Sequence, residues 1–231
     1  MSGPDFKNAR KRANLTQVQA ARRLGVTQAY LSMTESGERP LSGVLLKRAR
    51  RVYGLGPAAL PLDLPNSHRT MPRDFWAQAL SGLGYPGFAH EKCRRGMQMN
   101  PAAFLLAALD QDELVARVVE ALPWVPIRYA DMDWDWLVAG AKAGDRQNRL
   151  GFVVGLAAEL ADAAPDEPAA LRLRQECVKL EHSRLVREDT LCHEGMTSAE
   201  RSWLREKRPA LAAHWNLLTD LRTEHLQYAS G

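Results

Sequence analysis

Hydrophobic residues recur at helical spacing along most of this chain, and no stretch alternates convincingly as a strand would. In the first part of the sequence the pattern predicts four short helices, over about residues 5–13, 16–24, 27–36 and 42–53. From Arg73 onward it predicts helices over 73–83, 101–109, 111–122, 133–163, 166–191 and 198–228. The expected fold class is therefore all-α.

Cap residues mark the ends of the second and third helices. Thr16 and Thr27 can accept hydrogen bonds from free N–H groups where these helices start, and Gly25 tolerates the positive φ needed between them. The stripe of the second helix expected to face inward consists of Val18, Ala20, Ala21 and Leu24. On the third helix Leu31 is the expected core anchor, and the side chains left to face outward are Gln28, Ala29, Ser32 and Met33.

The last two predicted helices are long and amphipathic, and a short turn joins them. They are expected to form a long antiparallel helical hairpin at the end of a larger C-terminal domain. The heptad-spaced residues Leu171, Val178, Leu185 and Cys192 fit either ordinary bundle packing or a coiled-coil dimer. Within 133–163 a break is expected near Gly140 to Gly144.

Prolines separate the two groups of helices. Residues 54–72 hold four of the 13 prolines together with several leucines, which predicts an extended connector that packs in part on a domain. The expected organisation is a first domain at 1–55, a Pro-rich connector at 56–72 and a helical domain at 73–231.

The first domain resembles a known DNA-binding family. From about Asp5 to Leu55 the chain is similar to the xenobiotic-response-element (XRE) family of helix-turn-helix domains, which includes the phage Cro and repressor proteins. The resemblance rests on Leu15-Thr16-Gln17, Ala21, Leu24-Gly25-Val26, Leu31-Ser32, Glu35, Gly37 and Arg39. It implies a repressor-like fold whose second motif helix reads base edges in the major groove.

The resemblance also implies roles for single residues. It assigns base reading to Gln28, Ala29, Ser32 and Met33, among which Gln28 suits a bidentate contact to adenine. The expected phosphate contacts are Gln17, Thr27, Tyr30 and Arg39. Two of these residues have other readings: Thr27 is first of all a helix cap, and Tyr30 either contacts the sugar-phosphate backbone or packs on the following loop. Glu35 is expected to link the motif to a neighbouring helix.

Charge is distributed unevenly along the chain. Residues 1–72 hold twelve Lys and Arg against four Asp and Glu, a net charge of +8, whereas the remainder carries 19 against 23, a net charge of −4. Basic clusters flank the motif at Lys7, Arg10, Lys11 and Arg12, and again at Lys47, Arg48, Arg50 and Arg51. This asymmetry favours phosphate binding by the first domain alone.

Other classes of function find little support in the sequence. The three cysteines are sparse, no leader-like segment begins the chain and no long apolar run is present, so a cytoplasmic location without membrane contact is expected. The spacing of Cys177, His182, Cys192 and His193 matches no common zinc site. We expect no metal, no cofactor and no catalytic residues, and hence no enzyme.

The second domain contains one unusual stretch, Asp131-Met132-Asp133-Trp134-Asp135-Trp136. Its tryptophans suit a partner-binding edge, while its acids also suit a helix start. Residues 134–152 are weakly similar to C-terminal regions of XRE regulators from toxin–antitoxin modules. This similarity implies a bound toxin, with Trp134, Trp136, Arg146 and Asn148 as the contacts; hydrogen bonding within the domain is the alternative for the polar pair.

Taken together, the sequence predicts a DNA-binding transcription regulator, a repressor that binds a pseudo-palindromic duplex operator as a homodimer. The second domain is expected to act as the toxin-binding part of an autoregulating antitoxin. The alternative is a repressor whose helical domain encloses a small-molecule effector.

Overall fold

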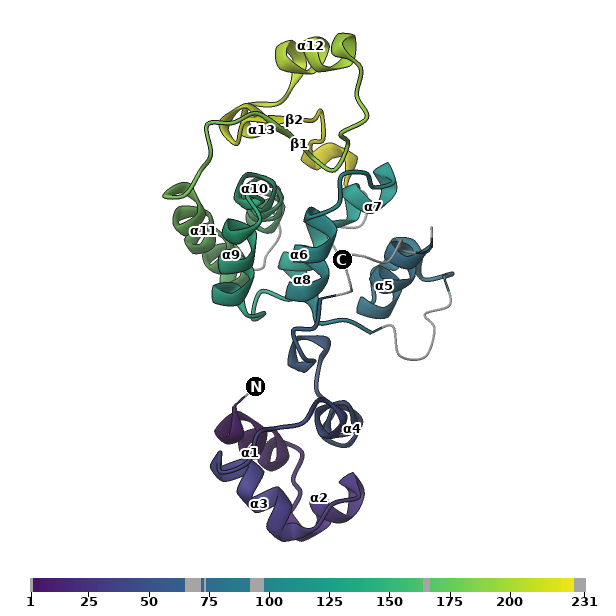
Figure 1. Ribbon diagram of the computed structural model, residues 1–231, viewed down its shortest axis with the longest axis vertical. Helices are drawn as coiled ribbons and strands as arrows, with labels where there is room; N and C mark the ends of the chain where they lie inside the picture. The colour runs from purple at the N-terminus through teal and green to yellow at the C-terminus, as the bar shows by residue number, and fades with distance from the viewer. Residues whose placement is uncertain (1, 65–71, 73, 92–97, 164–166, 227–231) are drawn as a thin grey trace. The chain divides into compact units, whose positions relative to one another are not determined.

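Short helices with well-defined ends make up most of the protein, whose computed structural model describes residues 2–64, 72, 74–91, 98–163 and 167–226 (Figure 1). The chain divides into two units, Met1–Asp63 and Leu64–Gly231. Both units are helical, which confirms the all-α fold class. Part of the expected connector, residues 65–71, lies outside the described residues.

The first unit contains four α-helices followed by a short 3-10 helix. These elements are α1 (Gly3–Arg12), α2 (Gln17–Leu24), α3 (Gln28–Ser36), α4 (Gly43–Tyr53) and η1 (Pro57–Ala59). At the start of each of these α-helices a side-chain hydroxyl accepts a hydrogen bond from a backbone N–H of the first turn. The hydroxyls belong to Ser2, Thr16, Thr27 and Ser42 in turn. The ends predicted from the cap residues are therefore confirmed for α2 and α3.

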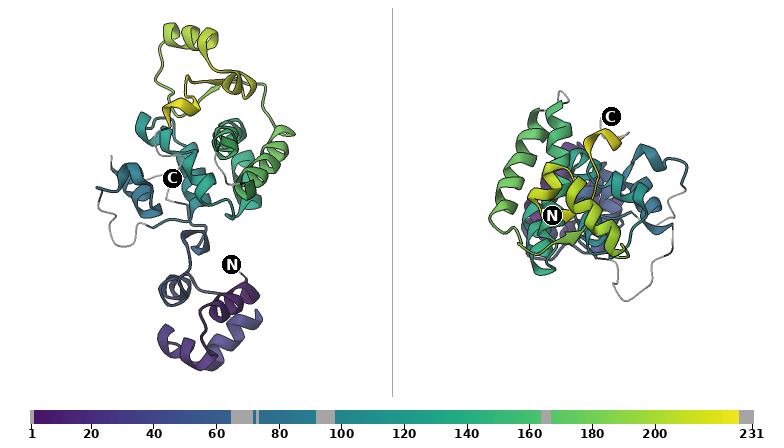
Figure 2. Two further views of the ribbon diagram at one scale, coloured as in Figure 1. Left: turned by 180° about the vertical axis from the view of Figure 1, so that it is seen from behind. Right: turned by 90° about the horizontal axis from the view of Figure 1, so that it is seen from above.

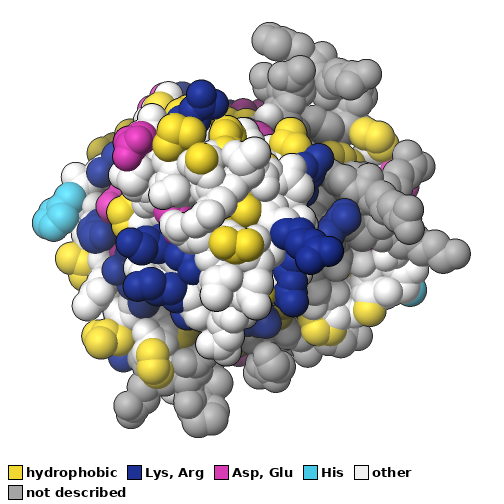
Figure 3. All heavy atoms as spheres, turned by 90° about the horizontal axis from the view of Figure 1, so that it is seen from below, with side chains coloured by type: hydrophobic (Ala, Val, Ile, Leu, Met, Phe, Trp, Pro, Cys, Tyr) yellow, Lys and Arg dark blue, Asp and Glu magenta, His cyan; other side chains and the backbone are white. Residues whose placement is uncertain are grey.

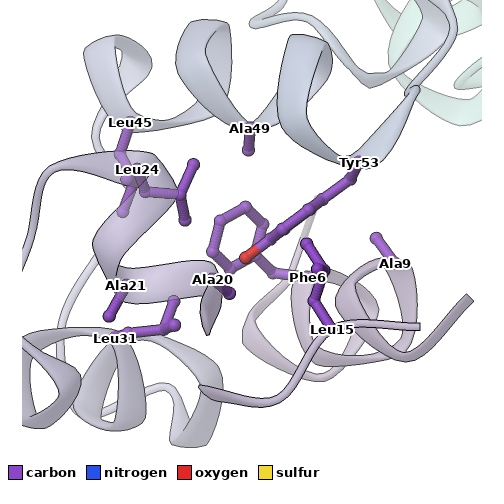
Figure 4. Close-up of a cluster of buried hydrophobic side chains, with 10 residues drawn as sticks. All are labelled: Phe6, Ala9, Leu15, Ala20, Ala21, Leu24, Leu31, Leu45, Ala49 and Tyr53. Carbon is purple, nitrogen blue, oxygen red and sulfur yellow. The ribbon is translucent and has the colours of Figure 1, made fainter. Parts of the chain in front are cut away.

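Residues from all four α-helices meet in the core of the first unit (Figure 4). Phe6 and Leu31 are fully buried, and the Phe6 ring lies 5.4 Å from the ring of Tyr53. The predicted inward stripe of α2 is correct for Ala20, Ala21 and Leu24 but wrong for Val18, which is 60% exposed. At about 100° per residue, Val18 lies roughly a third of a turn away from that stripe.

The second unit is built around one buried helix, α10 (Gln147–Ala163), which packs along α11 (Glu167–Glu181) (Figure 2). Thirteen of the 17 residues of α10 are buried. The other elements are α5 (Phe75–Leu83), η2 (Pro86–Phe88), α6 (Pro101–Leu109), α7 (Ala116–Ala121), α8 (Trp124–Arg128), α9 (Trp134–Ala143), β1 (Asp189–Thr190), α12 (Ser198–Lys207), α13 (Ala210–His214), β2 (Leu217–Leu218) and η3 (Thr223–His225).

The predicted break in 133–163 is confirmed, because α9 ends before Gly144 and α10 begins at Gln147. The predicted helix at 111–122 is shorter in the structure. Its first part is extended: Glu113 forms an isolated antiparallel bridge with His193, and the Leu114 N–H donates to the Cys192 carbonyl at 3.0 Å.

The predicted long helical hairpin is wrong. After α11 the chain leaves the helix at Glu181 because α10 side chains bind the backbone beyond it: Asn148 both donates to and accepts from Leu185, each at 2.8 Å. The predicted helix at 198–228 is divided into α12 and α13, with Pro209 capping α13. β1 precedes α12 and β2 follows α13, and the two strands pair in parallel.

The heptad-spaced stripe of α11 does not face the core. Leu171 and Val178 are 56% and 61% exposed, whereas Leu173 and Leu180 on the adjacent stripe are fully buried. The hydrophobic residues of α11 therefore cover two faces, and α10 packs on only one of them.

Candidate nucleic-acid interface

A three-residue turn sets the angle between α2 and α3. Gly25 takes the left-handed conformation with φ 69°, and the Val26 N–H donates to the Ala21 carbonyl at 3.0 Å. Thr27 then begins α3, because its hydroxyl accepts the Tyr30 N–H at 3.2 Å. Two short helices joined in this way are the arrangement in which the second helix can enter a major groove.

The outer face of α3 carries small and uncharged polar side chains. Gln28, Ala29 and Ser32 are exposed and Met33 is partly exposed, while Leu31 points into the core. The four residues predicted to read bases are thus accessible together on one helix. A bidentate amide such as that of Gln28 can match the two hydrogen-bonding groups of an adenine edge.

A buried ion pair fixes the far end of α3 to α1. The Arg10 guanidinium donates two hydrogen bonds to the Glu35 carboxylate, at 2.6 and 2.9 Å, and Glu35 is only 3% exposed. Burial alone would raise the pKa of Glu35, but the hydrogen bonds from Arg10 and Gln17 outweigh it and hold the pKa below its ordinary value. The expected linking role of Glu35 agrees with this geometry.

Arg10 itself was expected among the cations that clamp phosphate, and the structure corrects this. The side chain is buried, and besides Glu35 it donates to the Leu15 carbonyl at 2.8 Å. Nothing in the sequence separated Arg10 from its neighbours Lys11 and Arg12, which are exposed. Only the packing of α1 against α3 distinguishes them.

The predicted phosphate contacts lie at the starts of α2 and α3, on α3 itself and just beyond its end. Gln17 begins α2 and donates one N–H of its amide to Glu35 at 3.0 Å, so a second amide N–H remains. Thr27 caps α3. Beyond the end of α3, the exposed Arg39 places its guanidinium carbon 5.6 Å from the centre of the Tyr30 ring. The ring therefore supports a cation beside the exposed helix face.

Basic side chains gather on both sides of this region. Figure 3 shows two areas of Lys and Arg, separated by mostly uncharged side chains. The exposed basic residues of the first unit include Arg22, Arg23, Lys47 and Arg48. Arg48 also donates to the Leu24 carbonyl at 3.2 Å, which ties α4 to the last turn of α2.

Two of the four residues predicted to bind a partner in the second unit are internal. Trp134 is 1% exposed and its indole N–H donates to the Ala130 carbonyl at 2.9 Å; Trp136 is partly exposed. Asn148 is also 1% exposed. Arg146 pairs with Asp110 at 3.2 Å. Trp134 and Asn148 are thus not available to a partner in this structure, because the domain itself uses their polar groups.

Arg149, next to Asn148 on α10, binds several of the described groups of the second unit. It is fully buried and binds both carboxylate oxygens of Asp189 at 2.8 Å, one of Glu194 at 3.0 Å, and the carbonyls of Leu109 and Gln111. The sequence contained a signal for this role, because Arg149 is a charged residue within a hydrophobic helix. Such a residue is buried only when it is paired.

The cysteines have no metal partners among the residues described. Cys192 is buried, and burial raises its thiol pKa to about 12; Cys177 is partly buried, with a pKa raised to about 11. Within the described ranges no group of three or more His, Cys, Asp or Glu side chains could hold a metal ion, and no helix is suited to cross a membrane. Cys93 lies outside the described residues.

Comparison with known proteins agrees with the geometry of the first unit. Residues 6–60 match the helix-turn-helix family model. No match was found among the curated proteins, and none among the solved structures. The matched range covers all of α2, α3 and α4 and most of α1. The first unit is therefore a DNA-binding helix-turn-helix domain, and the chain that carries it is a DNA-binding transcription regulator.

Proposed function

We propose that this regulator is a repressor that recognises a specific duplex operator through the exposed face of α3. Two copies would place their α3 helices in successive major grooves, about 34 Å apart on one face of a pseudo-palindromic site. The observation that carries the proposal is the combination of an accessible, uncharged helix face with basic side chains on both sides of it. The cations would set affinity, and Gln28 with its neighbours would set sequence.

The proposal is tested by selecting operators from random duplex DNA and then comparing two variants on the selected set. Gln28→Ala should relax base preference at one position of each half-site, at a cost of about 1–3 kcal/mol for the preferred base, and leave the salt dependence unchanged. Arg39→Gln should weaken binding to every sequence alike and make the salt dependence shallower. If Gln28→Ala also weakened all sequences equally, Gln28 would not read bases.

The homodimer is part of the proposal, because a pseudo-palindromic site needs two recognition helices. Analytical ultracentrifugation of the protein on its operator should give two chains per duplex. A single chain per full site would contradict it.

For the second unit we propose a regulatory role, with two readings that predict different partners. In an autoregulating antitoxin this unit would hold a toxin protein, and purification from the native host should recover that protein in a stoichiometric complex. Because Trp134 and Asn148 are internal, the residues first proposed for that contact lend it little support. The effector-responsive reading is supported by a groove in the same unit.

A further inference from the structure

The second unit contains a groove of about 1320 Å³, and the inference drawn from it rests on the effector-responsive reading and names the class of effector. It lies between α7, the segment 191–196 with α12, and the residues from Leu218 to His225. Figure 1 shows these elements around the short β1–β2 pair. The volume exceeds the roughly 300–1,000 Å³ typical of small-molecule sites, so a drug-sized ligand would fit with room to spare.

The buried Arg149 does not line the groove itself, but it joins two segments that contribute lining residues. Its guanidinium binds the Gln111 carbonyl at 2.8 Å on one side, and Asp189 and Glu194 on the other. The two segments bound in this way also pair with each other, through the bridge between Glu113 and His193. A buried cation that joins both segments therefore fixes the part of the groove that these segments line.

The walls of the groove expose large hydrophobic side chains. Trp203 of α12 is 53% exposed, and Val115, just before α7, is 61% exposed. Met196 lines the same groove. An exposed tryptophan beside other hydrophobic groups in a concave site commonly marks a ligand-binding surface.

The charged side chains of the groove are mainly acidic. Of the residues that the structure describes, five carboxylates line it, from Glu113, Glu120, Glu200, Asp220 and Glu224, against the single guanidinium of Arg117. Arg117 is already engaged, since it donates to the Gly87 carbonyl at 3.0 Å and stacks 5.1 Å from the Phe88 ring centre.

Two of these carboxylates have partners that keep them ionised. The Gly195 N–H and His193 lower the pKa of Glu113, and the backbone and side chain of Thr197 lower the pKa of Glu200. Both groups are therefore negative near neutral pH. The other titratable side chains among the described lining residues are His193, His225, Tyr85 and Cys192.

We propose that this groove binds a small organic cation with an apolar body. The carboxylates would attract and orient the positive charge, while Trp203 and its hydrophobic neighbours would cover the rest of the molecule. A tryptophan face also attracts a cation directly. A neutral or anionic molecule of the same shape would gain the hydrophobic contact but meet the acidic lining at an energetic cost.

The test uses two probes that share a shape and differ in the sign of their charge, tetraphenylphosphonium and tetraphenylborate. Calorimetry on the full chain without DNA should show saturable binding of the cation, at least about tenfold tighter than any binding of the anion. Equal binding of both probes, or binding of neither, would overturn the proposal.

Variants then locate the bound cation. Trp203→Ala and the double variant Asp220→Asn with Glu224→Gln should each lower the affinity for tetraphenylphosphonium by about tenfold or more. Glu206→Gln is the matched control, since Glu206 is an exposed acid of α12 outside the groove, and it should leave affinity unchanged. If Glu206→Gln lowered the affinity for the cation as much as the double variant does, the attraction would be a nonspecific one to an acidic surface. That result would contradict the assignment of the site.

A short oligolysine peptide distinguishes a small ligand from a basic protein segment. It should bind more weakly than tetraphenylphosphonium; tighter binding that depends on Trp203 would overturn the small-molecule class. Because these measurements involve no DNA, their failure leaves the operator proposal standing, and failure of operator binding leaves the groove untouched.

Discussion

At the scale of single residues, Glu35 is central to the first unit because it joins three elements. It lies on α3, and its carboxylate accepts hydrogen bonds from Arg10 of α1 and Gln17 of α2. With 3% of its surface exposed, the carboxylate depends on these donors rather than on water. The orientation of the recognition helix therefore depends on a charge that never reaches the DNA.

Removing one member of the pair should destabilise the first unit strongly. Arg10→Met keeps the length of the side chain but leaves the Glu35 charge buried without its partner, which should cost about 3–5 kcal/mol. Adding Glu35→Leu removes the stranded charge and should recover most of that loss. Hydrogen exchange of α2 and α3 amides measures both. A double variant as unstable as the single one would contradict the buried-charge explanation.

The same pair makes stability depend on pH in a defined direction. The folded pKa of Glu35 is lower than the ordinary value of 4.5, because its hydrogen bonds outweigh burial. The stabilisation from Glu35 is therefore fully present above pH 4.5 and is lost as the pH falls below it through the lowered folded pKa. Denaturation of the first unit between neutral and acid pH should show this decline, and the double variant without Arg10 and Glu35 should show a shallower one.

The sequence predicted which side chains share a helix face, but not which charged side chain is buried. The exposed face of α3 followed from helical spacing, because spacing decides which side chains can share a face. Burial of a charge did not follow, since Arg10, Lys11 and Arg12 look alike in the sequence. Only the position of Glu35 on another helix selects Arg10 among them.

At the scale of elements, the start of α3 combines a structural role with a proposed role in binding. Thr27 caps the helix and was also predicted to contact phosphate. Thr27→Ala removes both and should cost about 1 kcal/mol of stability. Thr27→Asp keeps a good cap but places a negative charge where phosphate would lie.

The two variants therefore separate the roles of Thr27. If Thr27 contacts phosphate, the aspartate variant should be more stable than the alanine variant yet bind operator more weakly, as measured by thermal unfolding and fluorescence anisotropy. An aspartate variant that binds at least as well as the alanine variant would show that Thr27 is only a cap.

Helix ends were predictable where the chain itself supplies the signal, as with Thr16, Gly25 and Thr27. They were not predictable where distant residues decide. The hydrophobic spacing of 166–191 continues past Glu181, but Asn148 of α10 binds the backbone at Leu185 and ends the helical path. Pro209 was a local signal that should have divided the last helix, because proline in a helix interior removes a hydrogen bond.

Close contact between α10 and α13 depends on a missing side chain. A Cβ added to Gly151 would overlap the indole ring of Trp215, which is 2% exposed. Gly151→Ala should therefore destabilise the second unit by about 1–3 kcal/mol through overpacking. Gly144→Ala is the matched control, because its nearest neighbours would be 3.7 Å away and its φ is −101°. Denaturation followed by tryptophan fluorescence measures both; equal effects would rule out the overlap.

At the scale of the whole molecule, charge separates the two units as the sequence indicated. Residues 1–63, the first unit, hold 11 Lys and Arg against four Asp and Glu, a net charge of +7, and the rest of the chain holds 20 against 23, a net charge of −3. Phosphate contacts release counterions, and each contact adds about 0.9 to the negative slope of log affinity against log salt concentration. A unit with an acidic excess is a poor source of such contacts.

The salt dependence of DNA binding should therefore be a property of the first unit alone. On a duplex with a single half-site, residues 1–63 and the full chain should give the same slope between about 50 and 200 mM salt, even if their affinities differ. In the full chain, Arg39→Gln should make the slope shallower by about 1, while Lys142→Gln, which removes an exposed cation of α9, should not change it. A steeper slope for the full chain, reversed in part by Lys142→Gln, would mean that the second unit also binds the phosphate backbone. The difference in net charge would then not restrict phosphate binding to the first unit.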